Sequence, residues 1–465
     1  MAARDRRHRG RLAFWLPVGL VLAILAAATT AYLLDRGDEP PPGPAAVPPP
    51  PGLTLPAVET PDAVVDPATG TPDPRAVRRA VAGPLADADL GPHVVAVVAA
   101  LDGTPVFRDG TGTATPASTL KLLTAAAALE TLGPDHTFET TVVRAGPRRV
   151  VLVGGGDPLL EPSGLRKLAA LTAAGLSATK GPTKRPVSVG YDTSLFTGPD
   201  VSPHWPPTYV PEGVVSPIQS LWVDEGRDPD GYGRVADPAA TAAAAFAAAL
   251  AKAGVDVAGA PAPATAPAGV APVATLPSQP LSRIVEHTLE TSDNEAAEVL
   301  ARHVGLATSG QGSFAGGAAG VRDTVRALGV PLRGAVTYDG SGLSRQDRLD
   351  PATLTSLLDV AGSAAHPGLR SVMVGLPIAG FTGSLELRFD ATDPGRGFVQ
   401  AKTGTLTGVS GLAGIVTDRT GTPLLFALLA DRIDPVDTLG ARSALDDVTD
   451  ALASCRCGRA GTVAP

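Results

Sequence analysis

The chain has 465 residues, which is too long for one ordinary core and predicts two or three domains. Its formal net charge is −8 and its pI is near 5.4, an acidic balance that argues against nucleic acid as a partner. The seven histidines are scattered without the spacing of metal ligands, so the sequence predicts no metal site and implies no cofactor.

The first predicted elements are a targeting segment and a linker. Residues 1–11 carry five arginines against one aspartate, and residues 12–34 contain no charged residue. An apolar run of this length spans a bilayer, and the positive flank stays cytoplasmic, so everything after it is expected outside. We expect residues 12–34 to be an uncleaved transmembrane anchor, with a cleaved signal sequence as the alternative. Residues 35–73 are rich in proline and predict a semi-rigid, extended linker.

A serine and a lysine follow this linker at a spacing that suits catalysis. The intervening pattern predicts one helix and two strands, at 75–86, 93–101 and 105–107. Ser118 and Lys121 then precede an alanine- and leucine-rich run with high helix propensity. Side chains three apart share one helical face, so a nucleophile lies beside a base, at a helix N-terminus that favours negative charge. On its own, however, S-x-x-K is common by chance.

Residues 136–279 separate this motif from the next and predict a large inserted region. Strand periodicity dominates, with short strands expected at 138–143, 149–152 and 186–189. Asp237 is expected to cap an alanine-rich helix that ends near Ala253. A connection this long is not part of one compact core, so we expect the chain to return close to its exit. The insert is then expected to act on substrate recognition and not on the chemical step.

Two later motifs change the interpretation of the serine. They are Ser292-Asp293-Asn294, inside the amphipathic segment 281–304, and Lys402-Thr403-Gly404-Thr405, after a strand-like region. Each alone suits a helix cap or a turn, but the three motifs in this order are typical of serine acyl-enzymes. Lys121 has a chemical reason to be lysine, because a guanidinium cannot give up its proton near neutral pH.

The rest of the chain alternates helices with turns and ends in strands. Helices are expected at 319–328, 351–361, 368–374 and 436–453, and strands at 398–402, 409–416 and 424–429. Residues 454–465 form a C-terminal tail that contains both cysteines, Cys455 and Cys457. Pairing of the two and a disordered reduced tail are both open, because so short a loop removes little chain entropy.

These motifs resemble those of the serine penicillin-binding proteins, in particular the low-molecular-mass class C group of D-alanyl-D-alanine carboxypeptidases/endopeptidases. Residues 156–158 and 339–345 are also similar, and the resemblance covers most of 75–453. It implies an α/β (α+β) fold with a β-lactamase/transpeptidase-like core, an antiparallel sheet flanked by helices. The core would comprise 74–135 and 280–453, with a β-rich domain at 136–279 inserted between the first and second motifs.

The resemblance also implies roles for individual residues. Ser118 would form an acyl-enzyme with peptidoglycan stem peptides and react with β-lactams as inhibitors, with Lys121 as its base and Ser292 as a proton relay. Substrate binding would fall to Asn294, Lys402, Thr403, Gly404 and Thr405. Asp157 would reach a cationic group of the stem peptide, although a turn aspartate before proline is the alternative. The protein would then work on the outer face of the cytoplasmic membrane or, if secreted, in the cell wall space.

Three other functions share parts of this pattern. A β-lactamase uses the same motifs, but it resembles a much shorter chain and needs an efficient deacylation base. An esterase of this fold usually lacks S-D-N. A penicillin-binding sensor or scaffold would be acylated without turnover. Three outcomes distinguish these functions from one another: release of D-alanine, hydrolysis of β-lactam, and acylation without any product.

Overall fold

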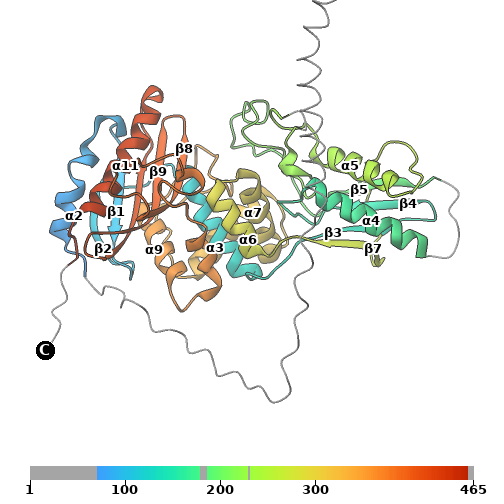
Figure 1. The fold of residues 1–465 in the computed structure, drawn as a ribbon, viewed down its shortest axis with the longest axis horizontal. Helices are drawn as coiled ribbons and strands as arrows, with labels where there is room; N and C mark the ends of the chain where they lie inside the picture. Colours follow the sequence, from blue (N-terminus) through green and yellow to red (C-terminus); the bar gives the residue numbers. More distant parts are fainter. Residues whose placement is uncertain (1–70, 179–185, 229–230, 459–465) are drawn as a thin grey trace, which may run out of the picture. The chain divides into compact units, whose positions relative to one another are not determined.

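The described part of the protein contains two five-stranded sheets (Figure 1). The computed structural model describes residues 71–178, 186–228 and 231–458. The predicted basic tail and membrane segment, and the linker up to residue 70, lie outside the described residues. In the part that is described, no helix is both long and apolar enough to cross a membrane.

The first sheet is antiparallel throughout and has the order β2-β1-β10-β9-β8. Its strands are β1 (Val94–Ala99), β2 (Pro105–Asp109), β8 (Val399–Leu406), β9 (Val409–Thr417) and β10 (Pro423–Ala430). Side chains alternate between the two faces of a strand. On β10, Leu425 and Leu429 therefore join one core, whereas Phe426 and Leu428 join the other. The predicted antiparallel sheet with helices on both faces is confirmed.

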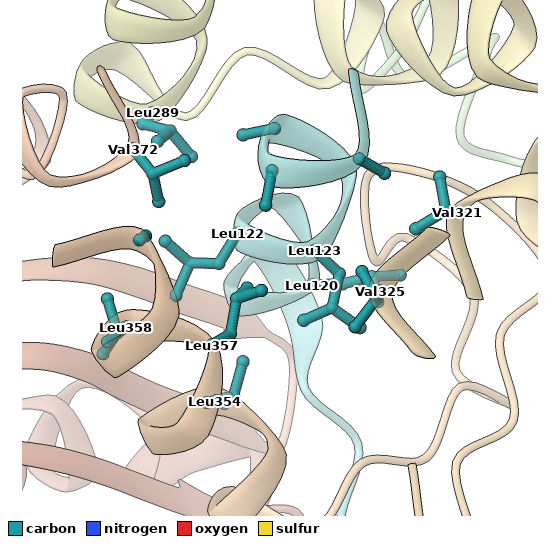
Figure 2. Packing of buried hydrophobic residues seen from close by; sticks show 14 of the residues in the cluster. Leu120, Leu122, Leu123, Leu289, Val321, Val325, Leu354, Leu357, Leu358 and Val372 are labelled. Carbon is teal, nitrogen blue, oxygen red and sulfur yellow. The ribbon is translucent and has the colours of Figure 1, made fainter. Parts of the chain in front are cut away.

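The first sheet and the helices packed around it, together called the first domain, build two cores. The helices are α2 (Pro74–Val81), α3 (Lys121–Leu132), α6 (Leu281–Thr291), α7 (Asn294–Ser309), α8 (Phe314–Ala327), α9 (Pro351–Gly362), α10 (Arg370–Val374) and α11 (Thr438–Ser454). Helices α2 and α11 cover one face of the sheet, and α3 and α9 pack against the other. Figure 2 shows α3 inside its core, surrounded by side chains of α6, α8, α9 and α10. This position explains the alanine-leucine run, because a helix that is buried on every side needs small or apolar residues all round.

The second sheet lies within the predicted insert and is mixed, with the order β6-β5-β4-β3-β7. Its elements are β3 (Glu139–Arg144), β4 (Arg149–Val153), α4 (Pro162–Ala178), β5 (Ser188–Asp192), α5 (Pro238–Lys252), β6 (Ala262–Pro263) and β7 (Pro272–Pro277). The predicted cap is confirmed, because Asp237 Oδ1 accepts from Ala240 N at 3.0 Å. Helix α4 and strands β6 and β7 were not predicted from the sequence. Since β4 and β5 are parallel, their connection must cross over the sheet, and α4 makes that crossover.

The chain leaves and re-enters the first domain at neighbouring points. Leu281 N donates to His136 O, and Ser278 N donates to Phe138 O, each at 2.8 Å. The expected return close to the exit is therefore confirmed. Between β5 and α5, however, the described residues of 193–237 are mostly irregular and pack largely against α7 and α8, although Leu221 joins the core of the second sheet. Buried aromatic side chains of this segment share one apolar cluster with residues of α7 and α8: Phe196, Trp205, Trp222, Val299 and Phe314.

The described end of the chain is ordered against the domain. Cys455 and Cys457 form a disulfide, which decides between the two alternatives for the tail. Cys457 is fully buried, and its carbonyl accepts from Asp73 N at 2.6 Å. The Asp418 carboxylate accepts the backbone N–H of Cys457 at 2.7 Å and that of Gly458 at 2.9 Å. This short segment is therefore part of the packed domain.

Candidate active site

Ser118 lies in a 3-10 turn, Ala117–Leu120, that leads directly into α3. Ala117 has φ of 47°, a left-handed conformation that residues with a Cβ seldom adopt. Two glycines make room for this turn. A Cβ on Gly342 would lie 1.9 Å from Ala117 O, and one on Gly404 would lie 2.7 Å from Pro116 O. The strained turn is thus held between a loop and strand β8, as strained backbone at functional sites often is.

Lys121 connects three parts of the site. Its Nζ lies 2.8 Å from Ser118 Oγ, 2.8 Å from Asn294 Oδ1 and 2.9 Å from Ser341 O. The side chain is fully buried. The spacing predicted from sequence therefore does bring the serine hydroxyl and the lysine amine into hydrogen-bond contact.

The loop that carries Ser341 is held by two buried acids that the sequence analysis did not select. Glu298 Oε1 accepts from Ser341 N at 2.8 Å and from Gly340 N at 3.1 Å. Asp339 accepts from Gly342 N at 2.8 Å and from Ser344 N at 2.7 Å. The D-G-S-G pattern was visible in the sequence, but its function as a support for Lys121 depends on α7, which lies far away along the chain.

The second motif lies between two helices of the amphipathic segment 281–304. Helix α6 ends at Thr291, and Ser292 has φ of 62° in the left-handed region. Asp293 then caps α7, since its Oδ1 accepts from Ala296 N at 2.9 Å. The break presents both Ser292 and Asn294 to the site, because Ser292 contacts the third motif and Asn294 contacts Lys121.

The third motif lies inside strand β8, which continues beyond the strand predicted at 398–402. Lys402 Nζ donates to Ser292 Oγ at 2.8 Å and to Thr403 O at 2.9 Å. Thr403 Oγ1 lies 2.7 Å from Ser384 Oγ, a residue the sequence analysis also missed. Among the described strands β8 is the last of its sheet, and its outer edge is paired only near its start, by a bridge between Ile378 and Gln400. Thr405 is exposed on this strand.

The two lysines differ in their electrostatic surroundings. Burial lowers the pKa of Lys121 to about 8, and nearby carboxyls, first Asp293 and then Glu298, oppose that shift. Burial also lowers the pKa of Lys402 well below its usual value, and the cations Lys121 and Arg388 lower it further. Lys121 is therefore suited to exchange a proton near neutral pH. The charged groups that shift the pKa of Lys402 are both cations. A carboxylate that bound beside it would therefore stabilise its positive charge.

Asp157 is the one candidate that comes from the inserted region. Its Oδ1 accepts from Leu159 N at 3.0 Å, and burial raises the pKa of its carboxyl to about 6. The preceding carbonyl, Gly156 O, lies 3.0 Å from His303 Nε2 on α7, which fixes the loop to the first domain. Within the described residues, no hydrogen bond joins the Asp157 side chain to the Ser118 network.

Comparison with known proteins agrees with this arrangement of motifs. The model of the D-Ala-D-Ala carboxypeptidase 3 (S13) family matches residues 77–229 and 231–452. Carboxypeptidase DacB of Mycolicibacterium smegmatis is 36% identical over 466 residues, which cover 97% of this chain and 100% of that protein. The D-alanyl-D-alanine carboxypeptidase of an Actinomadura strain is 30% identical over 409 residues, 69% of this chain and 74% of the relative.

A solved structure has the same fold. Penicillin binding protein 4 (dacB) from Haemophilus influenzae matches with a TM-score of 0.64 and 20% identity, covering 82% of this chain and 100% of that one. At this level of identity the likeness is evidence for the fold alone. It agrees with the expected transpeptidase-like core.

Proposed function

The chain belongs to the S13 family of D-Ala-D-Ala carboxypeptidases, and from this premise we propose that it cleaves peptidoglycan stem peptides through an acyl-enzyme on Ser118. The observation that carries the proposal is the buried contact of 2.8 Å between Lys121 Nζ and Ser118 Oγ. Cleavage of cross-links is the second reaction open to the same acyl-enzyme, since only the leaving amine differs.

The proposed reaction begins with a proton transfer. Neutral Lys121 takes the proton of Ser118 as Oγ attacks the carbonyl carbon of the penultimate D-alanine. The tetrahedral intermediate then collapses, the C–N bond breaks, and Ser292 relays a proton to the departing amine of the last D-alanine. Backbone N–H groups of Ser118 and Thr405 would stabilise the oxyanion by about 3 kcal/mol per donor. Water finally attacks the ester and regenerates the serine.

Substrate binding is assigned to β8 and to the start of α7. Lys402, Thr403 and Thr405 would hold the terminal carboxylate, with Gly404 keeping the strand close to the nucleophile. This assignment is supported by the absence of a carboxylate among the groups that shift the pKa of Lys402. Asn294 would hold the peptide amide of the stem.

Asp157 is proposed to bind a cationic group on the stem peptide. Its carboxyl is mostly buried, which raises its pKa to about 6. A cation beside it would favour the ionised form and lower that pKa again. If Asp157 has this role, Asp157→Asn should change the preference among stem peptides. If Asp157 only stabilises its turn, the preference should stay the same.

Location outside the cytoplasm, on the membrane or in the cell wall space, remains part of the proposal. It is supported by the basic residues of 1–11 and the uncharged run 12–34. Attachment through 12–34 predicts that the full chain stays with the membrane fraction. Cleavage of that segment predicts a shorter secreted protein.

The test is incubation of the purified full-length protein with intact and cross-linked muropeptides, with products identified by mass. We expect release of D-alanine, and none from the Ser118→Ala variant. Hydrolysis of β-lactam without D-alanine release would instead indicate a β-lactamase. Acylation without any product would indicate a sensor or scaffold.

A further inference from the structure

Among the described residues, three side chains that make no hydrogen bond to Ser118 or Lys121 converge at the second motif. They are Glu225, from the short turn Asp224–Gly226 of the inserted region, His287 on α6, and Asp293, which caps α7. One ligand atom from each lies within 4.8 Å of the other two. Imidazole nitrogen and carboxylate oxygen are both good ligands for divalent transition metals. Three separate chain segments therefore bring a mixed ligand set to one point.

The distance between the ligand atoms of His287 and Asp293 suits a shared metal ion better than a direct hydrogen bond. His287 Nε2 and Asp293 Oδ2 are 3.6 Å apart, which is beyond hydrogen-bond range. Two ligands bound to one tetrahedral zinc ion, each at its usual bond length, are about 3.4 Å apart. Small adjustments of the side chains would therefore complete the coordination.

The Asp293 carboxylate gives the second and independent indication of a ligand. Its Oδ1 is occupied by the cap of α7, whereas Oδ2, the atom that faces His287, is buried and has no hydrogen-bond partner within 3.5 Å among the described residues. The side chain is only 3% exposed. A buried carboxylate oxygen without a partner is costly, and a cation at this position would satisfy it.

The surrounding charges also leave room for a cation. Arg227 pairs with one oxygen of Glu225, and Arg234 pairs with the neighbouring Glu295 at 2.7 Å. Neither arginine pairs with Asp293, whose ion-pair partner among the described residues is His287. The His287 side chain is 41% exposed, which provides a path for the ion and a position for a water ligand.

A second group of possible ligands serves as a contrast. Asp418, Cys455 and Cys457 also lie close together, but the two cysteines are joined in a disulfide. Their thiolates are therefore not available to a metal. The Glu225 cluster does not have this restriction.

We propose that Glu225, His287 and Asp293 form a binding site for one divalent transition-metal ion, with zinc as the best match. The ion would tie the inserted segment to the junction of α6 and α7. Because Asp293 lies between Ser292 and Asn294, it would also fix the backbone from which both side chains reach the active site. Its function would be structural, because none of its ligands is assigned a step in the proposed Ser118 chemistry.

The test uses the untagged full-length protein after removal of metals with a chelator and dialysis. Zinc is titrated in by calorimetry against a competing chelator, and the melting temperature is recorded with and without zinc. We expect one ion per chain and, at about 100-fold excess over Kd, a rise in Tm of roughly 3 °C or more. Absence of stoichiometric binding, or an unchanged Tm, would overturn the proposal and leave a proton shared between the two carboxyls as the explanation of the cluster.

Variants separate this site from adventitious binding. Glu225→Gln and His287→Gln keep the size of each side chain, and each is expected to weaken zinc binding at least tenfold. Asp224→Asn is the matched control, because Asp224 lies in the same turn but is exposed. It should bind zinc like the unmodified protein. Equal affinity in all three variants would place the zinc elsewhere and contradict the assignment.

Discussion

At the scale of single residues, the two buried lysines of the site have different electrostatic surroundings. Lys121 is near the acids Asp293 and Glu298, and its hydrogen bonds run to Ser118, Asn294 and a backbone carbonyl. Lys402 contacts Ser292 and its own chain, and the other charges that act on it are cations. These surroundings suit Lys121 to proton transfer and Lys402 to binding an anion.

The pH dependence of acylation follows from the first of these roles. Since burial lowers the pKa of Lys121 to about 8, its neutral fraction rises with pH up to that value and then levels off. We expect the acylation rate at saturating penicillin to increase nearly tenfold per pH unit between about pH 6 and 7 and to reach a plateau above about pH 8.5. Stopped-flow measurement with a fluorescent penicillin gives this profile. A rate that is flat over the same range would exclude Lys121 as the base.

Arginine substitutions distinguish the two lysines. Lys121→Arg should lower acylation nearly as much as Lys121→Ala, because a guanidinium does not release its proton near neutral pH. Lys402→Arg should keep part of the activity, since it still presents a positive charge to a carboxylate. Acylation rates of the four single variants, including Lys402→Ala, test this difference. Equal losses for both arginine variants would contradict the assigned roles.

At the scale of elements, local motifs could be predicted from the sequence, but breaks between consecutive helices could not. The Ser118 turn, the cap at Asp237 and most strands follow from short-range patterns. The break at Ser292 does not, because the apolar periodicity of α6 continues into α7 without glycine or proline. Helix α4 was not predicted, because strand periodicity dominates the sequence of the inserted region around it. The support of Lys121 by Glu298 could not be predicted, since it depends on tertiary packing.

The close fit between the Ser118 turn and its neighbours predicts a matched pair of glycine variants. Gly342 and Gly329 have φ of 82° and 83°, so alanine costs about 1–2 kcal/mol of backbone strain at either position. Only at Gly342 would the new Cβ also meet backbone, at Ala117 O, whereas Gly329 has open space. We expect Gly342→Ala to reduce acylation at least 100-fold and Gly329→Ala to leave it within about threefold. Comparable acylation by both would mean that the turn does not need this contact.

At the scale of the whole molecule, part of the inserted region contacts residues that support the active site. Asn294 Nδ2 lies 3.4 Å from Val214 O, and Glu295 accepts from Ser216 N at 3.0 Å. Trp205 Nε1 donates to Asp339 Oδ2 at 2.7 Å and so contacts the acid that orders the Ser341 loop. The segment 193–237 thus contributes to the support of the active site, while the second sheet lies in the remaining parts of the insert. The periodicity of the sequence could not distinguish segment 193–237 from the parts of the insert that form the second sheet.

Two tryptophans of this segment test that contribution. Trp205→Phe removes the hydrogen bond to Asp339, and a buried bond to a carboxylate contributes about 1.5–3 kcal/mol. We expect roughly tenfold slower acylation by penicillin. Trp222→Phe is the matched control, because its Nε1 bonds the carbonyls of Asp157 and Pro158 instead. Circular dichroism should show both variants folded, and an equal effect on acylation would argue that Trp205 acts only through packing.

The most direct test of the account is the site of covalent attachment of penicillin. The full-length protein is mixed with penicillin, digested, and the modified peptide is identified by mass spectrometry. We predict one penicilloyl group per chain, attached to Ser118, and no adduct on the Ser118→Ala variant. An adduct on another residue, or labelling that persists in the alanine variant, would contradict the assignment of Ser118 as the nucleophile.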